Sequence, residues 1–60
     1  MKGTILIQDT ETGKILEEIG TVIYDNASRA IQNAEYWYAE ELAFWADQNY
    51  QPEILLVDCK

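Results

Sequence analysis

A stretch of 23 residues without glycine or proline, from Ala27 to Asn49, limits the folds open to this chain of 60 residues. Six alanines within the stretch give it a high intrinsic helix propensity. Asp25 or Asn26 can cap its first turn by accepting a hydrogen bond from a free backbone amide, and Pro52 favours an extended chain after it. The stretch therefore predicts one long helix, about 35 Å in length at 1.5 Å per residue.

Short runs rich in β-branched and other apolar residues predict three strands around this helix. The strands are expected at residues 4–8, 14–24 and 53–58. The polar residues 9–14 are typical of a hairpin loop in which Gly13 takes a positive φ. Gly20 predicts a bulge or a bend in the second strand, and a short helical turn at residues 15–19 is the alternative for that segment.

The order of these elements, β-β-α-β, predicts an α+β fold with a single domain over residues 1–60. A crossover through the helix makes the second and third strands parallel to each other. The first strand is the most apolar, so it fits between them, antiparallel to both, in the order 2-1-3. The helix should cover one face of this mostly antiparallel three-stranded sheet and extend beyond it, because a strand of ~6 residues spans only about 20 Å.

Charge and residue types exclude several functions. Eleven acidic residues against four basic ones give a net charge of −7, which disfavours direct binding to nucleic acid. The chain has no histidine, and Cys59 is its one cysteine, so it lacks the side chains for a zinc site, a Ser-His or Cys-His pair, or a disulfide. We expect no enzyme, metal or cofactor, since one helix on a three-stranded sheet forms no pocket around its paired carboxylates.

The sequence also bears on the compartment. No apolar run approaches the ~20 residues of a membrane span, and the first residues lack the apolar core of a signal peptide. A single unpaired cysteine, Cys59, is typical of a reducing compartment. We therefore expect a cytoplasmic protein that does not bind membranes.

Helical periodicity sorts the side chains of the long helix into three groups. A stripe that should face the sheet contains Ala27, Ile31, Ala34, Tyr38, Leu42 and Trp45. Trp37 and Phe44 fall to one side of this stripe. On the other side, a strip that another helix can approach closely contains Ala39, Ala43 and Ala46. A helix that is apolar around so much of its circumference usually has a second partner to pack against.

The strands also carry more apolar side chains than one helix can cover. In the second strand, alternation places Ile15, Ile19 and Ile23 on one face, with Leu16, Val22 and Tyr24 on the other. An antiparallel sheet with one face in water shows a cleaner alternation. We therefore predict a homodimer, with the alanine strip and the second strand at its interface: Ala39, Ala43, Ala46, Leu16 and Val22. A monomer with tolerated surface apolar residues is the alternative.

Aromatic and acidic residues are interleaved between positions 36 and 50, where six of the seven aromatic residues lie. In an acidic chain, exposed aromatic residues favour a protein interface, and the carboxylates around them favour a basic partner. The predicted contact residues are Glu35, Tyr36, Trp37, Glu40, Phe44 and Asp47. The alternative is that Tyr38 and Trp45 belong to the core and the acids keep the helix soluble.

The layout resembles small acidic phage-encoded inhibitors of host nucleic-acid enzymes or defence complexes. The resemblance lies in Val22-Ile23-Tyr24, the helix through Ala30 and Ala34 to Tyr36, and the final Ile54-Leu55-Leu56-Val57. The chain is also similar to HicB-type antitoxins, although it lacks their Pro-Gly-Cys loop. The first resemblance implies an inhibitor or decoy that occupies a basic, nucleic-acid-binding surface of a partner protein, with carboxylates in place of DNA phosphates. The second implies the alternative, a homo-oligomeric accessory or antitoxin-like regulatory module.

Overall fold

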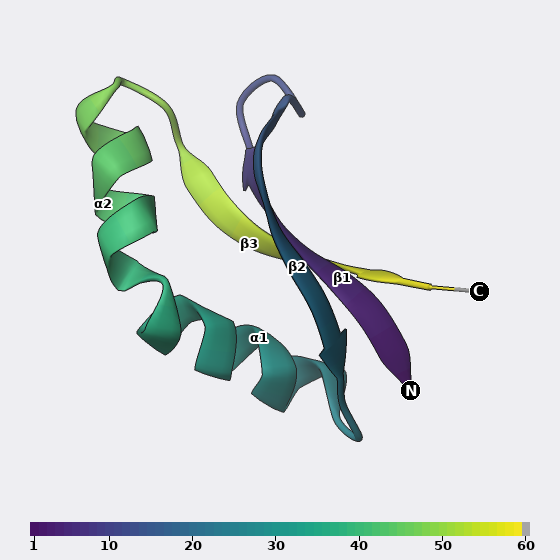
Figure 1. The fold of residues 1–60 in the computed structure, drawn as a ribbon. Helices are drawn as coiled ribbons and strands as arrows, with labels where there is room; N and C mark the ends of the chain where they lie inside the picture. The colour runs from purple at the N-terminus through teal and green to yellow at the C-terminus, as the bar shows by residue number, and fades with distance from the viewer. Residues whose placement is uncertain (60) are drawn as a thin grey trace.

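The computed structural model describes residues 1–59 and confirms the α+β fold. Along this part of the chain the elements are β1 (Lys2–Asp9), β2 (Ile15–Ile23), α1 (Ala27–Trp37), α2 (Ala39–Asp47) and β3 (Pro52–Asp58). The strand order is β2-β1-β3, and β1 is antiparallel to both neighbours, as predicted. The two helices form an arc along one face of the twisted sheet, and both contact β3 (Figure 1).

The prediction of one long helix is wrong, because the chain turns at Tyr38. This residue has φ −112° and ψ 27°, outside the helical range, and separates α1 from α2. The backbone hydrogen bonds continue through the turn: the Tyr38 amide donates to the Ala34 carbonyl at 2.8 Å, and the Leu42 amide donates to the Tyr38 carbonyl at 3.0 Å. The turn therefore redirects the axis at little loss of hydrogen bonding.

Packing on the sheet explains the turn, since no glycine or proline marks it. A straight helix of this length would measure about 35 Å, whereas the longest dimension of the whole molecule is 33 Å. With the turn, Ile31 of α1 and both Leu42 and Trp45 of α2 pack against the same core. The predicted overhang is therefore absent, because both halves of the segment reach the sheet.

The core lies between the sheet and the two helices. Its buried residues are Ile5, Ile7, Ala34 and Ile54, and Ile7 is fully buried. Successive residues of β1 alternate in exposure, so Ile5 and Ile7 face the helices while Leu6 lies on the opposite face. We call that opposite side, which no helix covers in residues 1–59, the free face of the sheet.

The β2 strand departs from simple alternation. Its pairing with β1 shifts register twice, and the residues left without a partner are Leu16 and Ile19. These bulges place Ile19 on the helix side, where it packs against the core with Leu16 and Val22. The predicted grouping of Ile19 with Ile15 and Ile23 is therefore wrong, although the bulge predicted near Gly20 is present.

The hairpin loop between β1 and β2 forms as predicted. Gly13 has φ +79°, a conformation that glycine adopts without steric penalty. Its amide donates to the Asp9 carbonyl at 2.8 Å, and the Asp9 amide donates to the Lys14 carbonyl at 2.8 Å. The segment is therefore closed by backbone bonds at the end of β1.

The Asp9 carboxylate joins this loop to the start of β3. Asp9 is buried and accepts hydrogen bonds from the Thr12 hydroxyl at 2.7 Å, the Gln51 amide at 3.0 Å and the Glu11 amide at 3.3 Å. These bonds, that from Thr12 first, lower the pKa of Asp9 below its ordinary value. The ionised form of Asp9 therefore stabilises the fold.

Stability should fall in acid because of Asp9. A carboxylate whose pKa is lower in the folded state contributes stability above the pKa of the unfolded chain, and that contribution is lost as pH falls through the folded pKa. We expect Asp9→Asn to lower the thermal midpoint at neutral pH and to flatten its decline below about pH 4. Thermal unfolding followed by circular dichroism across this range measures both effects. Glu11→Gln is the matched control, and an equal flattening in that variant would contradict the role of Asp9.

Candidate partner-binding surface

The outer side of α2 presents an aromatic residue between two carboxylates. Glu40, Phe44 and Asp47 follow the spacing i, i+4, i+7, so they share one side of the helix. All three are exposed, and Phe44 keeps 55% of its surface in water. Ala43 lies between them, so we call Glu40, Ala43, Phe44 and Asp47 the acidic face of α2.

The opposite side of α2 is fixed to the rest of the molecule by Trp45. The indole Nε1 of Trp45 donates to Oε1 of Glu17 on β2 at 3.0 Å. The Trp45 ring also meets the rings of Phe44 and Tyr50 edge to face, with centroids 5.1 and 5.7 Å apart. Trp45 therefore packs on the core, as the periodicity predicted, and supports the exposed Phe44 from behind.

The structure brings together two of the predicted contact residues of α1 and separates the third from Trp37. Tyr36 and Trp37 are 79% and 74% exposed and meet edge to face with centroids 5.9 Å apart. Glu35 and Trp37, however, lie about 160° apart around a helix of 3.6 residues per turn. The six predicted residues therefore do not form one face: Glu40, Phe44 and Asp47 come together, whereas Glu35 and Trp37 point to different sides.

Charge is distributed unevenly along the chain. Between residues 30 and 59 there are six carboxylates and no lysine or arginine. Glu40 and Glu41 occupy the first turn of α2, where the positive end of the helix dipole stabilises them. Asp47 ends the same helix, whose last turn contains no basic residue, and a carboxylate is unfavourable there. The helix dipole therefore explains a carboxylate at position 40 but not one at position 47.

The predicted oligomer residues lie in two places. Ala39, Ala43 and Ala46 are exposed on α2, where Ala43 belongs to the acidic face and the other two lie beside it. Leu16 and Val22 are half-buried on the helix side of the sheet, because of the bulges in β2, and so are not on the free face. The free face carries other apolar side chains: Leu6, Ile15, Ile23, Leu55 and Val57. Homodimer formation stays a prediction.

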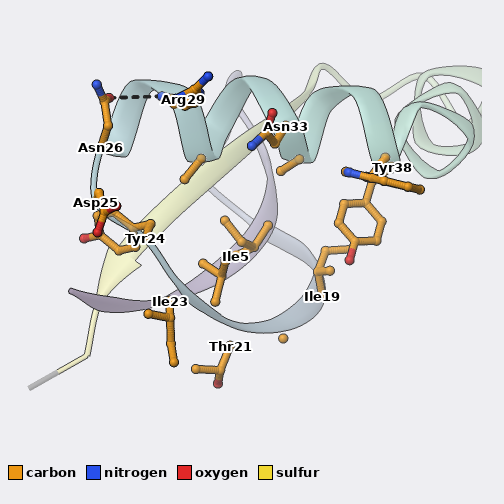
Figure 2. Close-up of a pocket in the computed structure, with 15 residues that line it drawn as sticks. Ile5, Ile19, Thr21, Ile23, Tyr24, Asp25, Asn26, Arg29, Asn33 and Tyr38 are labelled. Atoms are coloured by element: carbon orange, nitrogen blue, oxygen red, sulfur yellow. Dashed lines mark hydrogen bonds between the residues drawn. The ribbon is translucent and has the colours of Figure 1, made fainter.

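A groove of about 480 Å³ opens between α1 and the second half of β2 (Figure 2). The sequence argument expected no pocket around the paired carboxylates, and this groove contains none of those pairs, since Asp25 is the carboxylate that lines it. Ile5 and Ala34 are among the apolar residues that line the groove, and its charged residues are Asp25 and Arg29. The groove arises because α1 packs toward β3 and leaves β2 partly uncovered. The uncharged run of residues 19–24 was the one sequence signal for it.

Residues 1–59 contain no group of three or more Asp, Glu, Cys or His side chains arranged to hold a metal ion. Neither helix is long and apolar enough to cross a membrane.

Comparisons with protein-family models, with curated proteins and with solved structures find no match to this chain.

Proposed function

We propose that this protein is a non-catalytic, cytoplasmic binding module whose acidic face of α2 occupies a basic surface of a nucleic-acid-handling protein. The observation that carries the proposal is the position of Phe44, exposed between Glu40 and Asp47 on a helix that Trp45 holds to the core. The protein acts as an inhibitor or decoy, as in phage anti-defence or host-takeover proteins, because its carboxylates take the place of nucleic-acid phosphates.

The chemistry of this face suits a basic partner. An aromatic ring held rigidly at the surface is the usual anchor of an interface, since it buries a large area at a small entropic cost. Carboxylates beside it attract a basic partner from a distance and then form charge-assisted hydrogen bonds with arginine or lysine. The absence of basic residues between positions 30 and 59 means that no internal cation in this segment competes for them.

Asp47 gives independent support. Its carboxylate at the end of α2 opposes the helix dipole, which costs about 0.3–1 kcal/mol. A residue that is unfavourable for the fold and exposed on the acidic face is more readily explained by binding than by stability.

The test compares two double variants that change net charge equally. The protein is immobilised and used to capture proteins from a bacterial lysate at about 50 mM salt, followed by elution up to about 500 mM. We expect basic nucleic-acid-binding proteins to be retained, to elute with salt and to be displaced by double-stranded DNA. Glu40→Lys with Asp47→Lys should reduce their retention about tenfold, whereas Glu11→Lys with Glu53→Lys should retain them.

Stability measurements separate lost binding from lost folding. Asp47→Lys should raise the free energy of unfolding by about 0.5 kcal/mol, and Glu40→Lys should lower it by a similar amount, since the two changes act at opposite ends of the helix dipole. The double variant should therefore unfold at the wild-type urea concentration. Equal loss of binding in both double variants would show that net charge alone acts, and retention that is insensitive to salt would contradict the proposal.

A further inference from the structure

The groove beside β2 lies next to an edge of the sheet. Within residues 1–59, β2 is the outermost strand on its side, because the strand order is β2-β1-β3. Thr21 and Ile23 line the groove, although Figure 2 shows their side chains pointing away from α1. The groove therefore extends to the backbone at the outer edge of β2, where a further strand can add.

Hydrogen bonding in the β1–β2 ladder leaves backbone groups free at this edge. Met1 and Tyr24 exchange two bonds: the Tyr24 amide donates to the Met1 carbonyl at 2.9 Å, and the Met1 amino group donates to the Tyr24 carbonyl at 2.9 Å. In an antiparallel pair, hydrogen-bonded and non-hydrogen-bonded positions alternate. Thr21 and Ile23, which face Thr4 and Lys2, therefore direct their amides and carbonyls away from β1.

The groove wall that an added strand would meet is apolar in part, and Asn26, Arg29 and Asn33 contribute polar groups to it. Figure 2 shows the side chain of Ile5 between α1 and β2, and Ala30 and Ala34 of α1 also line this volume. Gly20 contributes no side chain, and a Cβ placed there would meet nothing within 4 Å. Small residues on both sides leave room for the alternate side chains of an extended segment, which is the arrangement found in strand-addition sites.

Charges at the ends of this edge indicate what kind of segment fits. The uncharged residues 19–24 are bracketed by Glu18 and Asp25, both exposed. Arg29 on α1 lines the groove and Lys2 on β1 pairs with Ile23, whereas Glu18 and Asp25 lie at the two ends of the edge, where cations of a bound segment would meet them. A second copy of β2 would instead bring its own Glu18 and Asp25 to the same edge, in a chain that already carries a net charge of −7. The edge therefore favours a basic partner over self-pairing.

We infer that an extended segment of a partner protein, alternating apolar and basic residues, adds as a fourth strand at the edge of β2. Its backbone pairs with Thr21 and Ile23, its apolar side chains fill the groove against α1, and its basic side chains lie on the free face near Glu18. This site does not involve the acidic face of α2, so it does not depend on the function proposed for that face.

The probe is an acetylated and amidated peptide of about nine residues that alternates valine and lysine. We expect a dissociation constant below about 100 µM, together with slower hydrogen exchange at the Thr21 and Ile23 amides in nuclear magnetic resonance spectra. A peptide with methylated backbone nitrogens at alternate positions should bind at least about tenfold more weakly, because it cannot complete the ladder. Unchanged exchange at both amides on saturation would overturn the inference.

Two variants on α1 form a matched pair. Ala30→Leu fills the groove and should weaken the peptide about tenfold, whereas Gln32→Leu adds the same side chain about 160° away around the helix and should have no effect. Equal affinities in the two variants would contradict a site in the groove.

Further measurements separate this site from the other candidates. The Glu40→Lys, Asp47→Lys double variant should bind the peptide with wild-type affinity; loss of binding there would place the peptide on α2 and overturn the inference. Sedimentation and hydrogen exchange of the protein alone at about 100 µM should show unprotected Thr21 and Ile23 amides, whether or not the predicted homodimer forms through another surface. A dimer that protects them would instead make a second copy the occupant.

Discussion

Replacement of Ile7 by alanine is expected to remove about half of the protein's free energy of unfolding at 25 °C. Ile7 is the one fully buried large side chain in residues 1–59, and it lies at the centre of the sheet, paired with Glu17 on one side and Ile54 on the other. Removing its outer carbons from a packed core costs about 2–5 kcal/mol. A domain of this size has a total stability of about 3–9 kcal/mol, so the loss is about half of the total.

Urea denaturation followed by tryptophan fluorescence measures this effect. Ile7→Val, which removes a single methylene, should cost about 0.5–1.5 kcal/mol and keep the protein folded. Ile23→Ala is the exposed counterpart: Ile23 is 82% exposed, so the change should stay within about 0.5 kcal/mol. Similar losses for Ile7→Ala and Ile23→Ala would mean that the core does not lie between the sheet and the helices.

The two tryptophans should respond very differently to alanine substitution. Trp45 packs on the core and donates to Glu17, so Trp45→Ala should lower the free energy of unfolding by about 3 kcal/mol, near the lower end of the range for a buried tryptophan. Trp37 is 74% exposed, so Trp37→Ala should change the free energy of unfolding by less than about 0.5 kcal/mol. Both changes remove the same atoms, which makes each variant the control of the other.

A third substitution divides the role of Trp45 into packing and hydrogen bonding. Trp45→Phe keeps a ring against the core but removes the donor to Glu17, and it should cost about 1 kcal/mol. Urea denaturation monitored by circular dichroism is suitable here, because the fluorescence of the variants differs. If Trp37→Ala proved the more damaging of the two alanine variants, the orientation of α2 on the sheet would be wrong.

Part of the candidate site could be predicted from the sequence. The spacing of Glu40, Phe44 and Asp47 places them together on any helix, whether or not the helix continues through Tyr38. The same rule of about 100° per residue places Glu35 and Trp37 on different sides of the helix. The prediction grouped them because they are close in the sequence, and it did not apply this rule. The groove was not predictable, because its walls belong to α1 and β2, and only their packing determines the distance between them.

Features that depend only on neighbouring residues could be predicted from local patterns. The hairpin loop required a residue with positive φ, and Gly13 supplies it. The start of α1 required a cap, and the Asn26 side chain accepts from the Arg29 amide at 3.1 Å. The strand order followed from the apolar content of β1, which is buried between two neighbours. Each of these rests on local stereochemistry or on the burial of one segment.

The turn at Tyr38, the bulge at Leu16 in β2 and the groove depend on tertiary packing. The 23 residues from Ala27 to Asn49 have the composition of one straight helix. The backbone hydrogen bonds of the segment nevertheless continue through the turn at Tyr38. Burial of Ile31 and Leu42 on one small sheet selects the bent form, because a straight helix would leave one end without a partner. Packing against distant residues outweighs local propensity there, and those distant contacts are what a local sequence pattern does not contain.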